Sequence, residues 1–125
     1  MPLRLGDEIP NLTVESTEGT ISLHDYVGDG WCILFSHPAD YTPVCTTELG
    51  TVAKLQDDFA RRNVKTIGVS VDPLDSHQGW IKDINETQNT TMNYPLIADP
   101  DRQVAEAFDM IHPNVDDKAT VRSVF

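Results

Sequence analysis

The chain has 125 residues, which suits one domain with a single hydrophobic core and leaves no room for a second domain. Its 20 acidic and 9 basic residues give a formal net charge of −11 at pH 7, an excess whose simplest role is solubility. This charge argues against nucleic acid or an anionic membrane as a partner, because both attract clustered Lys and Arg side chains. No apolar run approaches the ~20 residues that span a bilayer. Residues 1–8 lack the apolar region of a secretory signal, so we expect a cytoplasmic protein.

The first half of the chain predicts a hairpin, a strand and a long helix. Residues 12–16 and 20–22 favour a β-hairpin with Gly19 in its turn, and a short helical piece follows at 23–26. The apolar run at 31–36 has the length and composition of a strand. Apolar residues then recur at three- and four-residue steps, which predicts a helix from about residue 44 to residue 62 or 63.

The second half continues the alternation of strands and helices. Residues 65–71 predict a parallel strand covered on both faces. A helix that is capped by Asp75 or Ser76 should run to about Ile84, and residues 94–98 predict a short strand. Asp99 followed by Pro100 favours the start of a helix that ends near residue 108. Residues 119–125 predict a final strand, so the whole order indicates an α/β fold.

Cys45 occupies the junction between the strand at 31–36 and the helix that follows. It falls in the first turn of that helix, where unpaired backbone N–H groups and partial positive charge stabilise a thiolate over a thiol. Thr42 precedes it by three residues and can direct its hydroxyl to the same point. Pro38 and Pro43 fix backbone angles and stiffen the loop. The pattern therefore predicts a nucleophilic cysteine.

The spacing of Pro38, Thr42 and Cys45 resembles the active-site motif of the peroxiredoxins. The sixteen positions 35–50 are similar to the one-cysteine subgroup of that family, and the resemblance extends in outline from Leu5 to Phe125. It implies a thioredoxin-like fold with an N-terminal β-hairpin. It also implies a thiol peroxidase whose cysteine attacks hydrogen peroxide or an organic hydroperoxide and becomes a sulfenic acid.

The same resemblance assigns roles to the residues around Cys45. Arg122, on the predicted last strand, would stabilise the thiolate and bind the peroxide. Thr42 would hydrogen-bond the peroxide and Pro38 would shield the pocket. The backbone N–H groups of Val44 and Cys45 would complete the donors.

Two further residues have supporting roles in this interpretation. Glu48, one turn after Cys45, would orient Arg122, although a glutamate in an early helical turn is favoured by the helix dipole in any case. His37 resembles a feature of the one-cysteine subgroup that is held close to the thiolate. Its alternative role is that of a loop histidine which only closes the pocket.

Other reactive side chains receive structural roles. Cys32 lies roughly 13 Å along the strand from Ser36, at ~3.3 Å per residue, which argues against a disulfide with Cys45 and favours a small buried apolar role. The remaining histidines have no partner at ligand spacing, so we predict no metal and no cofactor; they are His24, His77 and His112. Trp80 should pack in the core. Gly30 stands where some relatives carry the serine of a lipase-like pentapeptide, so no phospholipase role is predicted.

The predicted sheet is incomplete at its C-terminal end. The last strand lacks a hairpin partner and a covering helix, and the C-terminal domain that one-cysteine peroxiredoxins carry is absent. We expect residues 1–125 to be a C-terminally truncated peroxiredoxin domain. The alternative is that a second subunit covers the exposed edge.

The predicted partners follow from the predicted chemistry. They are a peroxide, an external thiol reductant such as thioredoxin or glutathione, and a second copy in a homodimer. Two other functions remain open at this point, a redox sensor with negligible turnover and a non-catalytic thioredoxin-like binding module. Neither a nucleic acid nor a membrane is expected as a partner.

Overall fold

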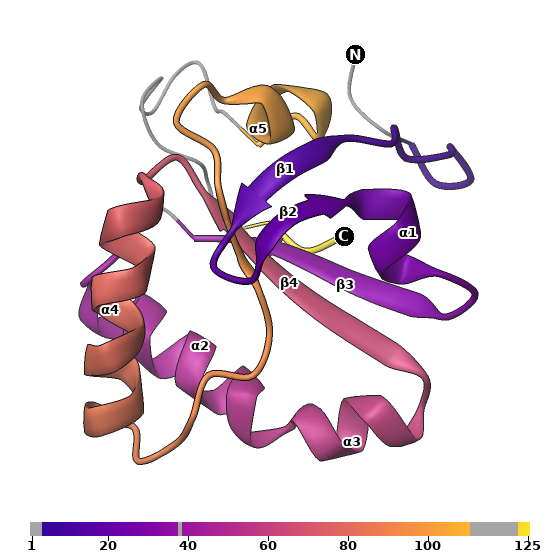
Figure 1. Ribbon diagram of the computed structural model, residues 1–125. Helices are drawn as coiled ribbons and strands as arrows, with labels where there is room; N and C mark the ends of the chain where they lie inside the picture. Colours follow the sequence, from indigo (N-terminus) through magenta and orange to yellow (C-terminus); the bar gives the residue numbers. More distant parts are fainter. Residues whose placement is uncertain (1–3, 38, 111–122) are drawn as a thin grey trace.

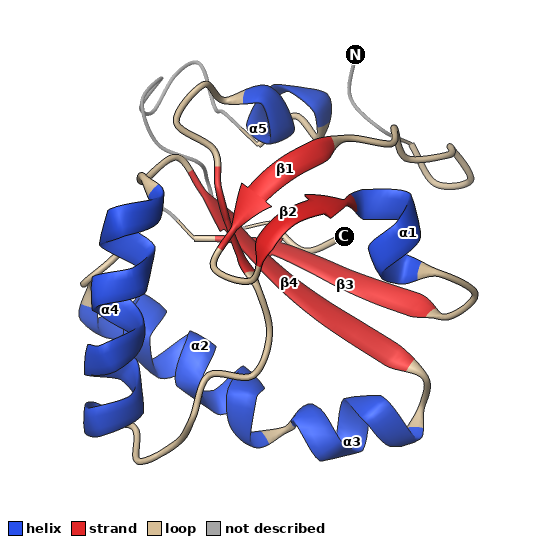
Figure 2. Cartoon of the chain, in the orientation of Figure 1, coloured by secondary structure: helices blue, strands red, loops and turns tan. Residues whose placement is uncertain are grey.

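The computed structural model describes residues 4–37, 39–110 and 123–125, which form one mixed sheet with helices on both faces (Figure 1). Strands and helices alternate along most of the chain (Figure 2). In order, the elements are β1 (Thr13–Ser16), β2 (Gly19–Ser22), α1 (Leu23–Val27), β3 (Trp31–Ser36), α2 (Pro43–Lys54), α3 (Gln56–Arg61), β4 (Val64–Ser70), α4 (Leu74–Thr87), β5 (Leu96–Ala98) and α5 (Gln103–Ala107). The predicted α/β class is confirmed.

Within the described ranges the sheet has five strands in the order β2-β1-β5-β4-β3. Strands β3, β4 and β5 are parallel, and the β1–β2 hairpin joins them through antiparallel pairing of β1 with β5. The last residues of the chain lie along the outer side of β3. There Phe35 bridges to Val124, and Leu34 and Phe125 exchange two backbone hydrogen bonds of 2.9 and 2.7 Å. The predicted last strand thus pairs with β3 at residues 123–125, while its earlier residues lie outside the described part.

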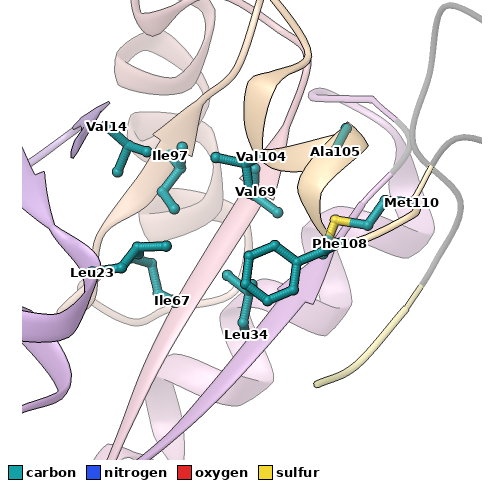
Figure 3. Packing of buried hydrophobic residues seen from close by; sticks show 10 residues of the cluster. All are labelled: Val14, Leu23, Leu34, Ile67, Val69, Ile97, Val104, Ala105, Phe108 and Met110. Atoms are coloured by element: carbon teal, nitrogen blue, oxygen red, sulfur yellow. The ribbon is translucent and has the colours of Figure 1, made fainter. Parts of the chain in front are cut away.

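Two hydrophobic clusters cover opposite faces of this sheet. The first lies under α1 and α5 and includes Leu34 of β3 (Figure 3). The second lies under α2 and α4 and includes Trp80, with Phe35 of β3 packed against it. Successive side chains of a strand point to opposite faces, so neighbouring residues of β3 serve different clusters. The active-site cysteine predicted from sequence belongs to the second cluster.

Several predicted boundaries differ from the structure. The helix predicted from residue 44 to 62 or 63 is two helices, because Leu55 adopts φ −95° and ψ 4° between α2 and α3. Helix α4 begins at Leu74 after Pro73, so the caps predicted at positions 75 and 76 are wrong. Helix α5 begins only at Gln103, because Arg102 is left-handed with φ 60°. No helix in the described ranges combines the length and apolarity needed to cross a bilayer.

Candidate active site

The loop between β3 and α2 is tied to the strand beside it. The backbone N–H of His37 donates to the carbonyl of Val69 in β4 at 3.1 Å. The backbone N–H of Asp40 donates to the carboxylate of Asp72, in the loop after β4, at 2.6 Å. Tyr41 then turns the chain with φ 62°. These constraints fix where α2 begins.

Cys45 is the third residue of α2 and is fully buried, with 0% of its surface exposed. Thr42 is the N-cap and Pro43 the first helical residue, a position where the missing N–H of proline costs no hydrogen bond. The strand-loop-helix placement predicted for this thiol is therefore the one observed. Leu49 and Trp80 lie in the same buried cluster, so the sulfur sits in an apolar setting at a helix N-terminus.

Thr42 directs its hydroxyl hydrogen into the loop. Its Oγ1 donates to the carbonyl of Ala39 at 3.0 Å, while its own carbonyl accepts from the N–H of Thr46 at 2.9 Å. The hydroxyl oxygen still has acceptor lone pairs. A hydrogen bond from Thr42 to the peroxide would require the hydroxyl to rotate, and that role stays a prediction.

The structure describes only some of the other residues predicted for the site. Pro38 and Arg122 lie outside the described residues. Val44 is 58% exposed, next to the buried Cys45. Glu48 is exposed and, with Ser123 and Val124, lines an apolar groove of about 560 Å³ between α2 and β3. Glu48 therefore borders the segment that directly follows Arg122 in the sequence.

A buried cluster of three side chains was missed by the sequence analysis. Asp40 is the centre of it: its Oδ1 lies 2.7 Å from Nε2 of His37, and its Oδ2 lies 2.6 Å from Nδ1 of His77. Ser76 also donates to Oδ2 at 2.8 Å. The two histidines are 0% exposed. The prediction that His77 has no partner is wrong, because the fold brings α4 against the loop that precedes Cys45.

The cluster holds Asp40 in its ionised form. Burial raises the pKa of Asp40, but the hydrogen bonds from His37, His77 and Ser76 outweigh it and leave the pKa well below its usual range. The ligand atoms of the cluster lie within 4.8 Å of one another, a separation that a metal ion can bridge. These histidine nitrogens and carboxylate oxygens already form short hydrogen bonds with one another, which satisfy them without a metal ion. The prediction of no metal stays a prediction.

Cys32 occupies the other face of the sheet from Cys45. It packs against the cluster under α1 and α5, and the two cysteines are not bonded to each other. Burial raises the pKa of the Cys32 thiol to about 11, against the opposing effect of Lys65. A thiol with this pKa is almost entirely protonated at neutral pH and is a poor nucleophile.

We expect Cys32→Ser to leave the oxidation of Cys45 by peroxide unchanged within about twofold, because Cys32 is protonated and lies across the sheet. The rate of thiol loss after one equivalent of hydrogen peroxide would measure this. A tenfold slower loss in the variant would instead give Cys32 a part in the chemistry.

The comparisons with known proteins agree with this geometry. The model of the AhpC/TSA family matches residues 5–125. The chain belongs to the AhpC/TSA family. Among curated relatives of this family, the 1-Cys peroxiredoxin of Dictyostelium discoideum is 52% identical over 123 residues, which cover 98% of this chain and 51% of that protein. Peroxiredoxin-6 of Gallus gallus is 48% identical, with 98% and 58% covered.

Solved structures of AhpC/TSA relatives confirm the fold. A mutant of peroxiredoxin 6 of Arenicola marina matches with a TM-score of 0.92 at 40% identity, over 98% of this chain and 59% of that one. The yeast mitochondrial 1-Cys peroxiredoxin matches with a TM-score of 0.91 at 46% identity, over 98% and 61%. The predicted resemblance to one-cysteine peroxiredoxins and the thioredoxin-like fold are confirmed. The chain spans about half the length of the curated relatives it matches.

Proposed function

We propose that the chain is the catalytic domain of a thiol-dependent peroxidase that reduces hydrogen peroxide and organic hydroperoxides through Cys45. The observation that carries the proposal is the position of Cys45, buried in the first turn of α2 at the end of a strand-loop-helix unit. The relative named 1-Cys peroxiredoxin, which is 52% identical over 98% of this chain, supports the same activity.

The proposed reaction consumes the thiolate of Cys45. Its sulfur attacks one peroxide oxygen, an S–O bond forms and the O–O bond breaks. Two electrons pass from sulfur to the peroxide, and the departing oxygen takes a proton to leave as water or an alcohol. The product is a sulfenic acid at Cys45. An external thiol then attacks this sulfur and releases water, and a second thiol resolves the mixed disulfide.

The residues around the sulfur are proposed to stabilise charge as it develops. The departing oxygen becomes negative, so fixed donors directed at it lower the barrier. Arg122 and the backbone N–H groups of Val44 and Cys45 are the proposed donors, and Glu48 would orient Arg122. Pro38 would shield the pocket and Thr42 would hydrogen-bond the peroxide. His37 is proposed to act beside the thiolate, which its complete burial in the same loop supports.

An external thiol is the proposed reductant, and no cofactor is proposed. The yeast relative is described as resolved via glutathione and thioredoxin systems, which supports either donor here. Because Cys45 is fully buried, a bulky thiol can reach its sulfur only if the groups that cover it move. We further propose a homodimer and a cytoplasmic location, the second because a thiol-reduced cysteine enzyme suits a reducing compartment. Size-exclusion chromatography with light scattering would test the dimer.

The proposed function predicts stoichiometric oxidation followed by turnover. One equivalent of hydrogen peroxide should remove one thiol per chain and add one oxygen to the intact mass. Excess dithiothreitol should then sustain peroxide consumption over many turnovers. One oxygen without turnover would indicate a redox sensor, and no thiol loss at all would contradict the peroxidase proposal. The mass measurement and a peroxide electrode separate these outcomes.

A further inference from the structure

The hydrogen bonds of His77 determine how many protons its ring carries. Its Nε2 lies 2.8 Å from the carbonyl of Ile97, which can only accept, so Nε2 carries a proton. Its Nδ1 lies 2.6 Å from Oδ2 of Asp40. Because Asp40 is held as a carboxylate and can only accept, Nδ1 carries a proton as well. Both ring nitrogens of the fully buried His77 therefore face acceptors, which is the arrangement that an imidazolium requires.

The other oxygen of Asp40 fixes the tautomer of His37. Its Oδ1 accepts from Nε2 of His37 at 2.7 Å, so that nitrogen carries the proton and the acceptor nitrogen of a neutral His37 ring is Nδ1. The opposite charges of Asp40 and His77 would leave little net charge beside the buried His37 ring. Within the described residues, two titratable groups face His77. They are Asp40, through its hydrogen bond, and His37, whose ring centroid lies 5.8 Å from that of His77.

Trp80 connects this cluster to the helix that carries Cys45. The rings of His37 and Trp80 lie 4.9 Å apart. The indole N–H of Trp80 donates to Oγ1 of Thr46, the residue after Cys45, at 2.9 Å. The indole is fully buried and belongs to the same apolar cluster as Cys45. Trp80 thus contacts the His37 ring and is hydrogen-bonded to the first turn of α2.

We propose that His77 and Asp40 are positioning residues for the peroxidase, which hold His37 with its proton on Nε2 and Nδ1 as the acceptor. This inference rests on the proposed function and adds His77 and Asp40 to the residues that support it. A proton must be received and returned when the peroxide is cleaved, and a neutral imidazole of defined tautomer can do both. Hydrogen bonds from His37, His77 and Ser76, together with the charge of His77, keep Asp40 ionised, and Asp40 in turn accepts from Nε2 of His37.

The protonation states can be measured without any turnover. Long-range ¹H–¹⁵N spectra of the histidine rings in the reduced, ¹⁵N-labelled protein at about pH 7.5 distinguish the three possible states of each ring. Spectra of His77→Phe and His37→Phe would identify the signals. We expect protons on both nitrogens of His77 and on Nε2 alone for His37. A singly protonated His77, or a His37 proton on Nδ1, would overturn the proposal.

The effect on chemistry is tested by Asp40→Asn, which preserves size but cannot accept from both rings at once. We expect its rate constant for Cys45 oxidation by hydrogen peroxide to fall at least about tenfold, with a shifted pH profile, because the His37 tautomer is no longer fixed. Asp72→Asn is the matched control. It removes the same charge nearby, and its amide oxygen can still accept from the Asp40 N–H, so we expect a change below about twofold.

The outcomes separate the two hypotheses. An Asp40→Asn rate equal to that of the wild type, in a chain whose Cys45 is readily oxidised, would overturn the positioning role and leave the peroxidase intact. A wild-type Cys45 that does not react with peroxide would overturn the peroxidase, while the ring spectra would still report the tautomers. If Asp40→Asn does not fold, the same rate comparison made with His77→Gln decides, because glutamine brings no positive charge to Asp40.

Discussion

Replacing Cys45 with serine is expected to abolish the uptake of oxygen that peroxide treatment causes in the wild type. Serine has nearly the same size, so the fully buried site should keep its packing. Its hydroxyl, however, does not ionise at neutral pH and cannot be oxidised to a sulfenic acid. Peroxide consumption with dithiothreitol should therefore fall to the uncatalysed background. Intact mass after one equivalent of hydrogen peroxide, and an electrode trace under turnover, measure both effects.

The control for Cys45→Ser is Cys32→Ser, which keeps the proposed nucleophile and removes the other cysteine of the chain. A gain of one oxygen in Cys32→Ser and none in Cys45→Ser assigns the reaction to one sulfur. The three methionines of the chain can also take up oxygen. Peptide mapping identifies that reaction, and rapid oxygen uptake by Cys45→Ser at Cys32 would contradict the proposed site.

Local sequence was sufficient to place Cys45 because all the signals lie within about fifteen residues of it on either side. A short apolar strand, two prolines and a helical stripe define the junction without reference to the rest of the fold. The same stripe misled the prediction further on. Val52, Leu55 and Phe59 keep helical spacing across the break, so periodicity cannot detect that Leu55 leaves the helix with ψ 4°.

The pairing of His77 with Asp40 could not be predicted from spacing, since the residues are 37 positions apart and meet only when α4 packs beside α2. A partial signal was nevertheless present. His77, Trp80 and Ile84 recur at helical spacing and form the buried face of α4. A histidine on such a face needs a buried partner. The sequence could therefore have predicted that His77 has a partner, although not which residue it is.

Asp99 shows how a correct signal can give a wrong boundary. The Asp-Pro pair does mark the start of a helix, and the carboxylate of Asp99 accepts from the N–H groups of Val104 and Ala105 at 3.0 and 2.8 Å. The chain first makes a turn through Arg102. The capping carboxylate therefore lies further from the N–H groups in sequence than the two or three residues of a usual N-cap. Turn geometry of this kind depends on packing under the helix, which the sequence does not reveal.

Replacing Asp40 with alanine is expected to lower the free energy of unfolding by about 3–5 kcal/mol near pH 7, because it leaves the buried His77 cation without its partner. Domains of this size are stable by about 5–15 kcal/mol in total, so the variant should be marginal. Asp58→Ala is the control. It breaks the exposed pair of Asp58 with Arg61 and should cost less than about 1 kcal/mol. Urea unfolding of the reduced proteins measures both values.

The stability difference between the wild type and Asp40→Ala should depend on pH in one direction. An aspartate in an unfolded chain has a pKa near ~3.9, and the hydrogen bonds of Asp40 lower its pKa below that value in the folded state in spite of burial. The unfolded state therefore binds the proton first as the pH falls, and the stabilisation by Asp40 is complete above about pH 5 and lost progressively below about pH 4. Unfolding curves should therefore show a smaller difference at about pH 3 than at about pH 5. A difference that grew from about pH 5 to about pH 3 would mean that Asp40 is protonated in the folded protein, and the charge assigned to His77 would then be wrong.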